Sequence, residues 1–370
     1  MKCEVEFLPV GEATKAGDCI VVRYGEEDAF QLMVVDGGIQ VTGDELVAHL
    51  HKQFGEDVEV EHVVLSHPDN DHASGLRTLL EQVRVRNLWI NIPWGFSELS
   101  LEYFEPGWTK ETLSAAIRDE YSILVEIMDA AVAQGAAIHY ALAGEVIGPF
   151  TVLSPSVSNY ALLLPQFSRT PPAREGALEA ADALINQPSG WLNKLYEKAK
   201  AVTQRWITDR WAAEELKDGG TTSAHNESST VLYANLGDKR LLLTGDAGVQ
   251  ALTWAVQFAH EHGLPLQQFT FVQIPHHGSR SNVGPTILNA LIGPVVRPTD
   301  KPKFSAYVSA PVDDEQHPRL MVLNAFTRRG GEVFSTKGET KVHTGGFALR
   351  PGYSSNTGSI PFSDKVEAYD

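Results

Sequence analysis

Residues 66–75 read SHPDNDHASG and follow directly on the valine-rich residues 58–65, which predict a β-strand. Two imidazole and two carboxylate side chains fall within this short stretch, at His67, Asp69, Asp71 and His72. Imidazoles and carboxylates hold Zn²⁺, Mn²⁺ or Fe with positions left open for water, and a strand end gives them a rigid root. The alternative is an acidic surface turn that caps the following helix, which we expect from about residue 76 to 83.

Three other predicted strand ends carry an aspartate or a histidine beside glycine. They are Asp36 before Gly37, Asp246 after Gly245, and the pair His276 and His277 before Gly278. Glycine lets the backbone turn closely past a small centre. Any one of these ends fits an ordinary turn, but four together are poorly explained by turns. The sequence therefore predicts one metal centre built from four strand ends.

The composition is that of a folded protein. The 370-residue chain is 43% hydrophobic and 21% charged, which predicts a well-buried core. Its two cysteines exclude a disulfide framework and a four-cysteine zinc site. The opening residues MKCEVEFLPVGE lack the pattern of a signal peptide, and no apolar run approaches the ~18 residues of a membrane span. We therefore expect a cytoplasmic protein with no membrane partner.

The charge balance bears on the substrate. Thirty basic and 47 acidic residues give a formal charge of −17, which repels polyanions at long range. The totals show no basic footprint for nonspecific nucleic-acid binding. A local patch or bound metal ions can still reverse the field at one site, so a nucleic-acid substrate is not excluded.

The pattern of predicted secondary structure changes twice along the chain. Residues 1–92 and 225–346 both alternate short β-type runs with helices, which predicts an α/β fold. Between them, residues 93–224 form a mainly helical insertion, with helices expected at 112–134 and 191–217 and an exposed proline- and arginine-rich loop at 164–174. Residues 347–370 are expected to form a C-terminal tail.

Four motifs resemble those of the metallo-β-lactamase-fold hydrolases: the loop 66–75, VDGG at 35–38, LLLTGD at 241–246 and IPHHGS at 274–279. Within that family, FLPVG at 7–11 followed by GDCI at 17–20 is similar to the group that includes the hydrolase domain of the competence DNA-uptake protein ComEC. The resemblance covers roughly residues 4–92 and 225–346. It implies an αββα metallo-β-lactamase sandwich, interrupted by the insertion 93–224.

The resemblance also implies roles for single residues. Metal ligands would come from His67, Asp69, Asp71, His72, Asp246, His276 and His317, with Asp246 bridging two ions. His277 can replace His276 as the ligand, and the other of the two would hydrogen-bond or protonate the reacting group. Asp71 or Asp246 would orient the attacking water, and Asp71, His276 and His277 are the catalytic candidates. Asp36 would orient the metal loop, residues 66–75, from behind the ligands, because ligating histidines need a carboxylate partner. Asn226 and Ser228 would also lie behind the ligands.

The chain departs from the family pattern at two positions. Asp69 stands where most members have a second histidine, and the oxygen-rich ligand set favours Mn²⁺, Mg²⁺ or Fe, with Zn²⁺ still open. The family's third histidine has no clear counterpart, because Asn226 or Ser228 lies closer to its position than His225. We therefore expect one or two divalent ions, with one tight and one weaker ion as plausible as a stable pair.

The leading functional hypothesis is a metal-dependent phosphodiesterase or nuclease. Ser279 and Arg280 follow the histidine pair and are placed to bind a substrate phosphate. One alternative is a hydrolase of a small ester, lactone or thioester, which suits the acidic charge better. Another is a non-catalytic scaffold with a degenerate metal site. The insertion would lie at the rim of the site as a lid, where a regulatory protein or a protease could act on it.

Overall fold

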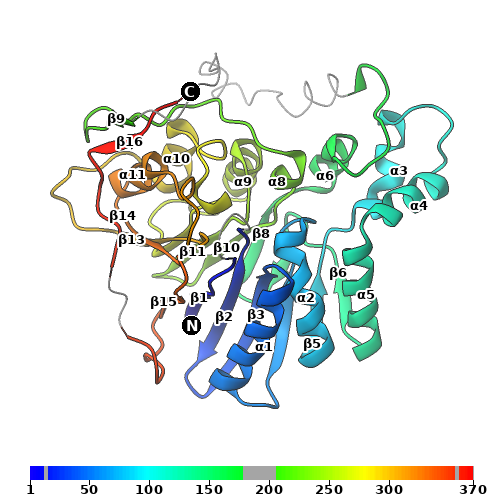
Figure 1. Ribbon diagram of the computed structural model, residues 1–370, viewed down its shortest axis with the longest axis horizontal. Coiled ribbons are helices and arrows are strands. Elements are labelled where there is room, and N and C mark those ends of the chain that lie inside the picture. Colours follow the sequence, from blue (N-terminus) through cyan, green and yellow to red (C-terminus); the bar gives the residue numbers. More distant parts are fainter. Residues whose placement is uncertain (12–15, 178–205, 355–357, 370) are drawn as a thin grey trace.

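The computed structural model describes residues 1–11, 16–177, 206–354 and 358–369. Within these residues, two seven-stranded sheets pack face to face, and helices cover their outer faces (Figure 1). The predicted fold class, an α/β protein with an αββα sandwich, is confirmed. No helix of the described residues is long and apolar enough to cross a membrane.

The first sheet has the order β15-β1-β2-β3-β4-β5-β6. Its strands are β1 (Lys2–Phe7), β2 (Cys19–Glu26), β3 (Ala29–Gly37), β4 (Glu59–Val64), β5 (Arg84–Trp89), β6 (Ala137–His139) and β15 (Lys341–His343). Strands β3 to β6 run parallel, and the others pair antiparallel. The helices on its outer face are α1 (Gln40–Phe54), α2 (Asn70–Gln82) and α5 (Ser122–Gln134).

The second sheet has the order β14-β13-β12-β11-β10-β8-β7. Its strands are β7 (Val146–Ile147), β8 (Phe150–Ser154), β10 (Val231–Asn235), β11 (Arg240–Leu243), β12 (Phe271–Gln273), β13 (Phe304–Val308) and β14 (Gly331–Ser335). Strands β11 to β14 run parallel. The helices on its outer face are α9 (Val249–Glu261), α10 (Pro285–Ile292) and α11 (Leu320–Arg328).

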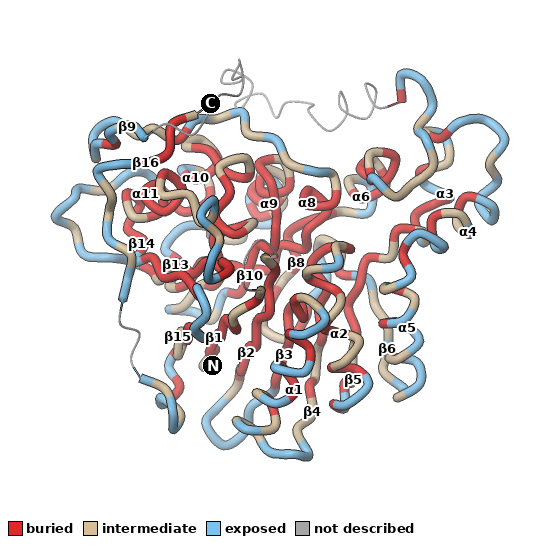
Figure 2. The backbone as a smooth tube through the Cα atoms, in the orientation of Figure 1, coloured by how far each residue is buried: buried red, intermediate tan, exposed pale blue. Residues whose placement is uncertain are grey.

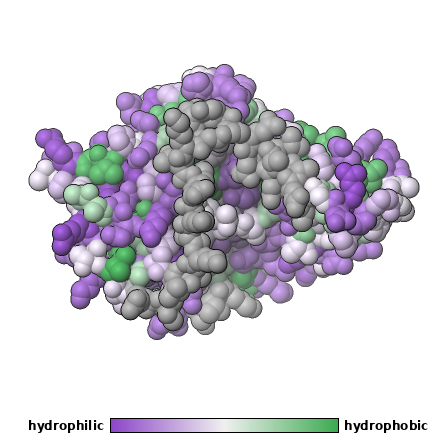
Figure 3. Space-filling view, turned by 90° about the horizontal axis from the view of Figure 1, so that it is seen from above, coloured by the Kyte–Doolittle hydropathy of each residue, from purple (hydrophilic) through white to green (hydrophobic). Residues whose placement is uncertain are grey.

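The core lies in three layers, one between the sheets and one under each set of helices. Figure 2 shows buried backbone along the strands and exposed backbone on the outer sides of the helices. Between the sheets, Phe7 of β1 packs against Phe271 and Tyr307, with ring centroids 5.9 and 5.7 Å apart. Seen from above, the described surface is mostly hydrophilic and its apolar residues are scattered (Figure 3).

The segment 93–224 contributes strands to both sheets, so its expected boundaries need correction. Strand β6 closes one edge of the first sheet, and β7 and β8 close one edge of the second. Strand β8 agrees with a strand expected at 151–154, but β6 and β7 are only three and two residues long, too short for a recognisable period-2 pattern. The other described elements there are η1 (Pro93–Phe96), α3 (Ser97–Ser100), η2 (Leu101–Tyr103), α4 (Lys110–Glu120), α6 (Val157–Leu163), η3 (Leu164–Gln166) and β9 (Trp206–Thr208).

Two further expectations for this segment were wrong in part. The helix expected over 112–134 is two helices, because Tyr121 between α4 and α5 leaves the helical region with φ −115° and ψ 51°. The loop expected to be exposed at 164–174 begins as η3, and Phe167 beside it is only 3% exposed. Exposed residues begin at Ser168.

The helix expected at 191–217 and the C-terminal tail also differ. Residues 191–205 lie outside the described residues, and 206–208 form β9 instead of helix. Strand β9 pairs with β16 (Lys365–Glu367), so the last residues pack onto the second half of the sandwich. Buried Glu367 accepts hydrogen bonds from the backbone N–H groups of Leu320 (2.9 Å) and Met321 (3.4 Å), where α11 begins.

A buried ion pair fixes this C-terminal packing. Arg328 of α11 is fully buried and donates two hydrogen bonds to the carboxylate of Asp209, which also accepts one from Asn324 (2.7 Å). We expect Asp209→Ala to lower the free energy of unfolding by about 3–5 kcal/mol, because it leaves a buried guanidinium uncompensated. Urea denaturation measures this. Asp300→Ala removes the partner of the exposed Arg297 and should cost less than about 1 kcal/mol. Equal losses in the two variants would contradict this assignment.

Candidate metal centre

The metal loop lies at the junction of β4 and α2. Helix α2 begins at Asn70, so Asp71 and His72 lie on its first turn instead of in a loop before a helix that starts near residue 76. Gly75 lets this helix pass close to the end of β3, because a Cβ atom there would lie 1.9 Å from the carbonyl oxygen of Gly37. The close contact brings the ends of β3 and β4 together.

Asp36 is the buried anchor of this arrangement. It is fully buried, and its carboxylate accepts hydrogen bonds from Ser66 N–H (2.7 Å), Ser66 Oγ (2.6 Å) and His72 Nδ1 (2.8 Å). Ser66 Oγ in turn lies 3.0 Å from Nδ1 of His67. Because the Ser66 hydroxyl donates its hydrogen bond to Asp36, Ser66 Oγ accepts a hydrogen bond from Nδ1 of His67. In their neutral, metal-binding forms both histidines therefore carry the proton on Nδ1 and turn an Nε2 lone pair away from Asp36.

Two histidines of the second half are held in the same way. Nδ1 of His277 lies 3.1 Å from the backbone carbonyl oxygen of Ser309, which can only accept a hydrogen bond. Nδ1 of His276 lies 2.7 Å from Oδ1 of Asn282, and the Asn282 amide donates to the carbonyl oxygen of Asp246 (2.8 Å). Both histidines have positive φ, 46° and 55°, which aims consecutive rings at the same centre.

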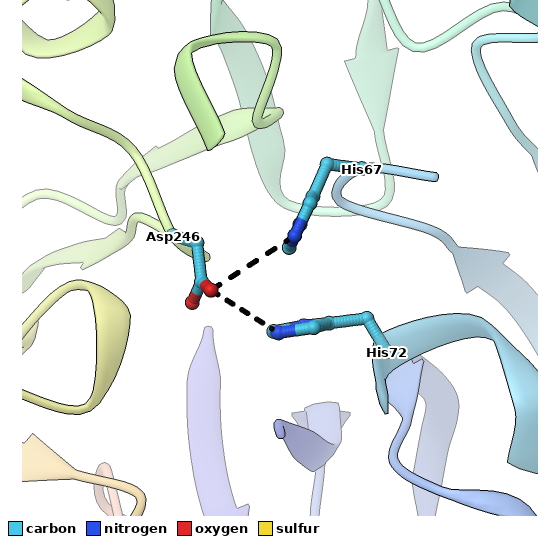
Figure 4. A group of neighbouring side chains, drawn as sticks. All are labelled: His67, His72 and Asp246. Carbon is cyan, nitrogen blue, oxygen red and sulfur yellow. Dashed lines mark ion pairs between the residues drawn. The ribbon is translucent and has the colours of Figure 1, made fainter. Parts of the chain in front are cut away.

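The four imidazoles surround one carboxylate oxygen. Oδ2 of Asp246 lies 3.9 Å from Nε2 of His67, 3.4 Å from that of His72, 3.6 Å from that of His276 and 3.7 Å from that of His277. Figure 4 shows His67 and His72 pointing at Asp246 from the opposite half of the sandwich. Oδ1 of Asp246 and Nε2 of His67, His72 and His277 are buried and have no hydrogen-bond partner. Lone pairs that face a carboxylate call for a cation, so these residues fit a divalent metal ion.

The electrostatics differ between the ligands: the carboxylates of Asp246 and Asp36 outweigh burial and raise the pKa of His72 well above its usual value. Burial would raise the pKa of Asp246, but the imidazoles of His276 and His72 outweigh it and hold the pKa well below its usual value. Burial lowers the pKa of His277 to about 3. At neutral pH, Asp246 is therefore ionised and His277 neutral, and these are the forms in which the two side chains bind metal.

Asp69 and His225 form a second contact at the centre. Oδ2 of Asp69 lies 3.6 Å from Nε2 of His67, and Oδ1 lies 2.9 Å from Nδ1 of His225. Nε2 of His225 meets the hydroxyl of Tyr121 at 2.8 Å, and the Phe167 ring packs edge-on against the same imidazole. His225 was not among the expected site residues, although it lies one position before Asn226. Only the fold brings Tyr121 and Phe167 to it.

The structure brings most of the expected metal ligands together. Groups whose ligand atoms all lie within 4.8 Å of one another are His67, His72 and Asp246; Asp71, His72 and His277; and Asp18, Asp36 and His72. His277 is buried, and its neighbour His276 has a side chain 31% exposed. This difference favours His277 as the ligand and His276 as the residue at the rim. Both roles stay predictions.

Three expected residues contact other partners. Nδ1 of His317 bonds to Asp314 (3.1 Å), and among the described residues His317 belongs to none of these ligand groups. Arg280 was expected to bind phosphate, but it donates to the carbonyl oxygen of Ala368 (2.7 Å) and lies over the Tyr369 ring. Ser279 Oγ accepts from the backbone of Ser281. The C-terminal segment therefore contacts Arg280, and phosphate binding by Arg280 stays a prediction.

Asn226 and Ser228 lie beside the centre without entering it. The Asn226 amide donates to Thr222 Oγ1 (2.7 Å) and lies 3.4 Å from the His276 ring nitrogens. Ser228 Oγ donates to the carbonyl oxygen of His225 (2.6 Å), which ties the turn that carries His225. Their expected place outside the ligand set agrees with these contacts.

Sequence reasoning missed a buried pair beneath the centre. Oδ2 of Asp18 accepts from Gln273 Nε2 (2.7 Å), and Gln273 Oε1 accepts from the N–H groups of Thr244 (2.8 Å) and Gly245 (3.1 Å). The pair fixes the turn that presents Asp246. Burial, with help from the charges of Asp246 and Asp36, raises the pKa of Asp18 to about 7. Its motif, GDCI, was noted only as part of a resemblance.

Comparisons with known proteins agree with the fold. The model of the Metallo-beta-lactamase superfamily matches residues 14–106, which hold β2 to β5 and the metal loop. The chain thus carries the fold of that superfamily. No curated protein matches the sequence. None of the comparisons bears on the likeness to ComEC, which stays a prediction.

Similar solved structures include Zn²⁺-bound PqqB from Methylobacterium extorquens, at 10% identity and TM-score 0.38, covering 91% of this chain and 99% of that one. A long form RNase Z from yeast has 9% identity and TM-score 0.34, covering 93% of this chain and 42% of that one. A beta-lactamase domain protein from Burkholderia ambifaria has 14% identity and TM-score 0.33, covering 74% and 66%.

Proposed function

We propose that the protein is a metal-dependent hydrolase that cleaves phosphodiesters, with nucleic acid as the favoured substrate. One observation carries the proposal: a single carboxylate oxygen of Asp246 lies 3.4–3.9 Å from Nε2 of four histidines. Three of these nitrogens are buried without a hydrogen-bond partner. A buried cluster of unsatisfied acceptors is costly to a fold, so it indicates a functional centre.

The side chains that would hold one or two divalent ions are His67, Asp69, Asp71, His72, Asp246 and His277. This set mixes carboxylate oxygens with imidazoles and suits Mn²⁺, Zn²⁺, Mg²⁺ or Fe. When bound, such an ion supplies a Lewis acid that makes water a stronger nucleophile at neutral pH. The oxygen-rich ligands favour a substrate whose own oxygens carry negative charge, and this supports a phosphodiester.

The chain itself orients the groups around the reacting phosphate. Asp36 holds the proton of His72 on Nδ1, which keeps Nε2 aimed at the centre. Asn282 does the same for His276, whose side chain is 31% exposed. Protonated at Nε2, His276 would donate a hydrogen bond to a phosphoryl oxygen or a proton to the leaving oxygen. Asp71, on the first turn of α2, would orient the attacking water.

A small ester, lactone or thioester is the second candidate substrate. Two observations favour it: the formal charge of −17, and the engagement of Arg280 by the C-terminal segment. A non-catalytic scaffold is less well supported, because a degenerate metal site does not explain four imidazoles that surround one carboxylate.

Metal-dependent cleavage tests the proposal. We expect the protein to hydrolyse bis-p-nitrophenyl phosphate and labelled DNA or RNA with Mn²⁺, Mg²⁺ or Zn²⁺, and to lose the activity in EDTA. His72→Ala should reduce the rate by more than about 100-fold, because it removes a buried group facing Asp246. His260→Ala, on the exposed side of α9, is the matched control and should keep the rate. Cleavage of p-nitrophenyl esters or lactones alone would select the second candidate.

A further inference from the structure

A polar hollow of about 240 Å³ lies beside the metal loop, between the first turn of α2 and the start of α5. Asn70, which lies between the expected ligands Asp69 and Asp71, forms part of its wall. Ser122, the first residue of α5, lines it from the other side, and Arg169 from the loop after η3 completes the rim.

Two arginines line the hollow, and they differ in their partners. Arg77 is paired with Glu81 (3.1 Å) and Glu126 (2.6 Å). The guanidinium of Arg169 lies 5.7 Å from the ring centroid of Tyr121, and among the described residues it has no carboxylate or hydrogen-bond partner. An arginine presents a planar fork of donors that matches a phosphate or carboxylate. In a chain with a formal charge of −17, a guanidinium without an acidic partner is available to an anionic ligand.

A short chain of contacts joins the hollow to the metal centre. Arg169 lies over the Tyr121 ring, the Tyr121 hydroxyl bonds to His225, and His225 bonds to Asp69. Tyr121 breaks the helix between α4 and α5, and this break places its ring between Arg169 and His225. An anion on Arg169 would therefore be held in the same hollow as Asn70 of the metal loop.

We propose that Arg169 binds a second phosphate of the substrate in this hollow, with the Asn70 amide and the Ser122 hydroxyl as further donors. This proposal rests on the proposed function. It makes Arg169 a specificity-determining residue: the enzyme prefers a phosphodiester with a neighbouring phosphate, as in a nucleic-acid chain, over an isolated phosphodiester. Phosphate recognition then comes from the segment 93–224 and not from the loop that carries Arg280.

Paired probes test the proposal. The two probes are p-nitrophenyl thymidine 5′-phosphate and the same compound with an added 3′-phosphate, so they differ only in the second phosphate. In the Mn²⁺-loaded protein, Arg169→Ala should raise KM for the 3′-phosphorylated probe about ten-fold, the loss of one charge-assisted contact, with kcat nearly unchanged. KM for the probe without the 3′-phosphate should not change. Arg169→Gln should behave like Arg169→Ala, and Arg174→Ala, which removes an exposed arginine of the same loop, should leave both KM values unchanged.

Binding without turnover separates this proposal from the proposed function. Thymidine 3′,5′-bisphosphate is titrated into the wild type and Arg169→Ala by calorimetry, whatever the hydrolysis assay shows. Weaker binding by Arg169→Ala than by the wild type supports the hollow as a phosphate site, even if neither probe is hydrolysed. Failure to hydrolyse either probe would instead count against the proposed function. Equal binding by both proteins, or an equal rise of KM for both probes, would overturn the assignment of Arg169.

Discussion

Asp246→Asn is expected to abolish metal binding and hydrolysis together. The asparagine has nearly the same shape, so the change removes a charge and little packing. It also places either an amide NH₂ group or a neutral carbonyl oxygen, a weaker metal ligand, beside the four imidazoles. In the wild type these imidazoles face a carboxylate oxygen at 3.4–3.9 Å. Loss of an outer partner costs metal affinity about 10–100-fold, and loss of this shared central ligand should cost at least the upper end of that range.

The measurement is metal content by mass spectrometry after dialysis against Mn²⁺ or Zn²⁺, with hydrolysis of bis-p-nitrophenyl phosphate alongside. Asp238→Asn makes the same chemical change in the exposed turn between β10 and β11 and should leave both unchanged. An Asp246→Asn protein that keeps its metal and its rate would place the centre elsewhere.

Asp36→Asn is expected to destabilise the fold and to weaken metal binding as well. The carboxylate accepts three hydrogen bonds in a fully buried position. An amide has one acceptor oxygen, so it sets an N–H group against Ser66 or against His72 Nδ1. A buried donor left without an acceptor costs about 1–3 kcal/mol. If His72 changes tautomer and carries its proton on Nε2, the nitrogen that faces Asp246 has no lone pair left to bind metal.

Urea denaturation of the metal-free protein isolates the structural cost, which we expect at about 2–4 kcal/mol. A chelator competition isolates the loss of metal affinity, expected at about 10–100-fold. Asp28→Asn lies in the exposed turn between β2 and β3 and is the matched control. A variant that loses stability but binds metal like the wild type would show that Asp36 serves only the fold.

The parts of this molecule that the sequence predicts are those with a local signal. Strands β3, β4, β11 and β12 end in an aspartate or histidine beside glycine, or run directly into the metal loop, and these ends meet in space. Parallel strands send their carboxyl ends to one edge of each sheet, so residue type at a strand end is enough to predict a shared site. Asp36 was recognised on the same ground.

Contacts between distant segments carried no such signal. Tyr121 lies 104 residues before its partner His225, and Gln273 lies 255 residues after Asp18. Arg280 follows the histidine pair in sequence, yet its guanidinium donates a hydrogen bond to the carbonyl oxygen of Ala368 in the C-terminal segment 358–369. Tertiary partners decide where a long flexible side chain points, and a sequence pattern does not encode them.

The short strands were lost for a different reason. β6 and β7 lie at the edges of the two sheets, and their sequences are too short for a period to emerge. The helix over 112–134 failed at one residue, since Tyr121 has a helix-compatible side chain and only its buried hydroxyl contact shows why the backbone breaks there.

The central claim is that Asp246 and the imidazoles around it hold a divalent ion. Crystals of the Mn²⁺-loaded protein, measured at the manganese absorption edge, test it most directly. We predict an anomalous peak bounded by Asp246, His72 and either His67 or His277, with no comparable peak in Asp246→Asn. A loaded, active protein whose anomalous peak lies away from Asp246 would contradict the account.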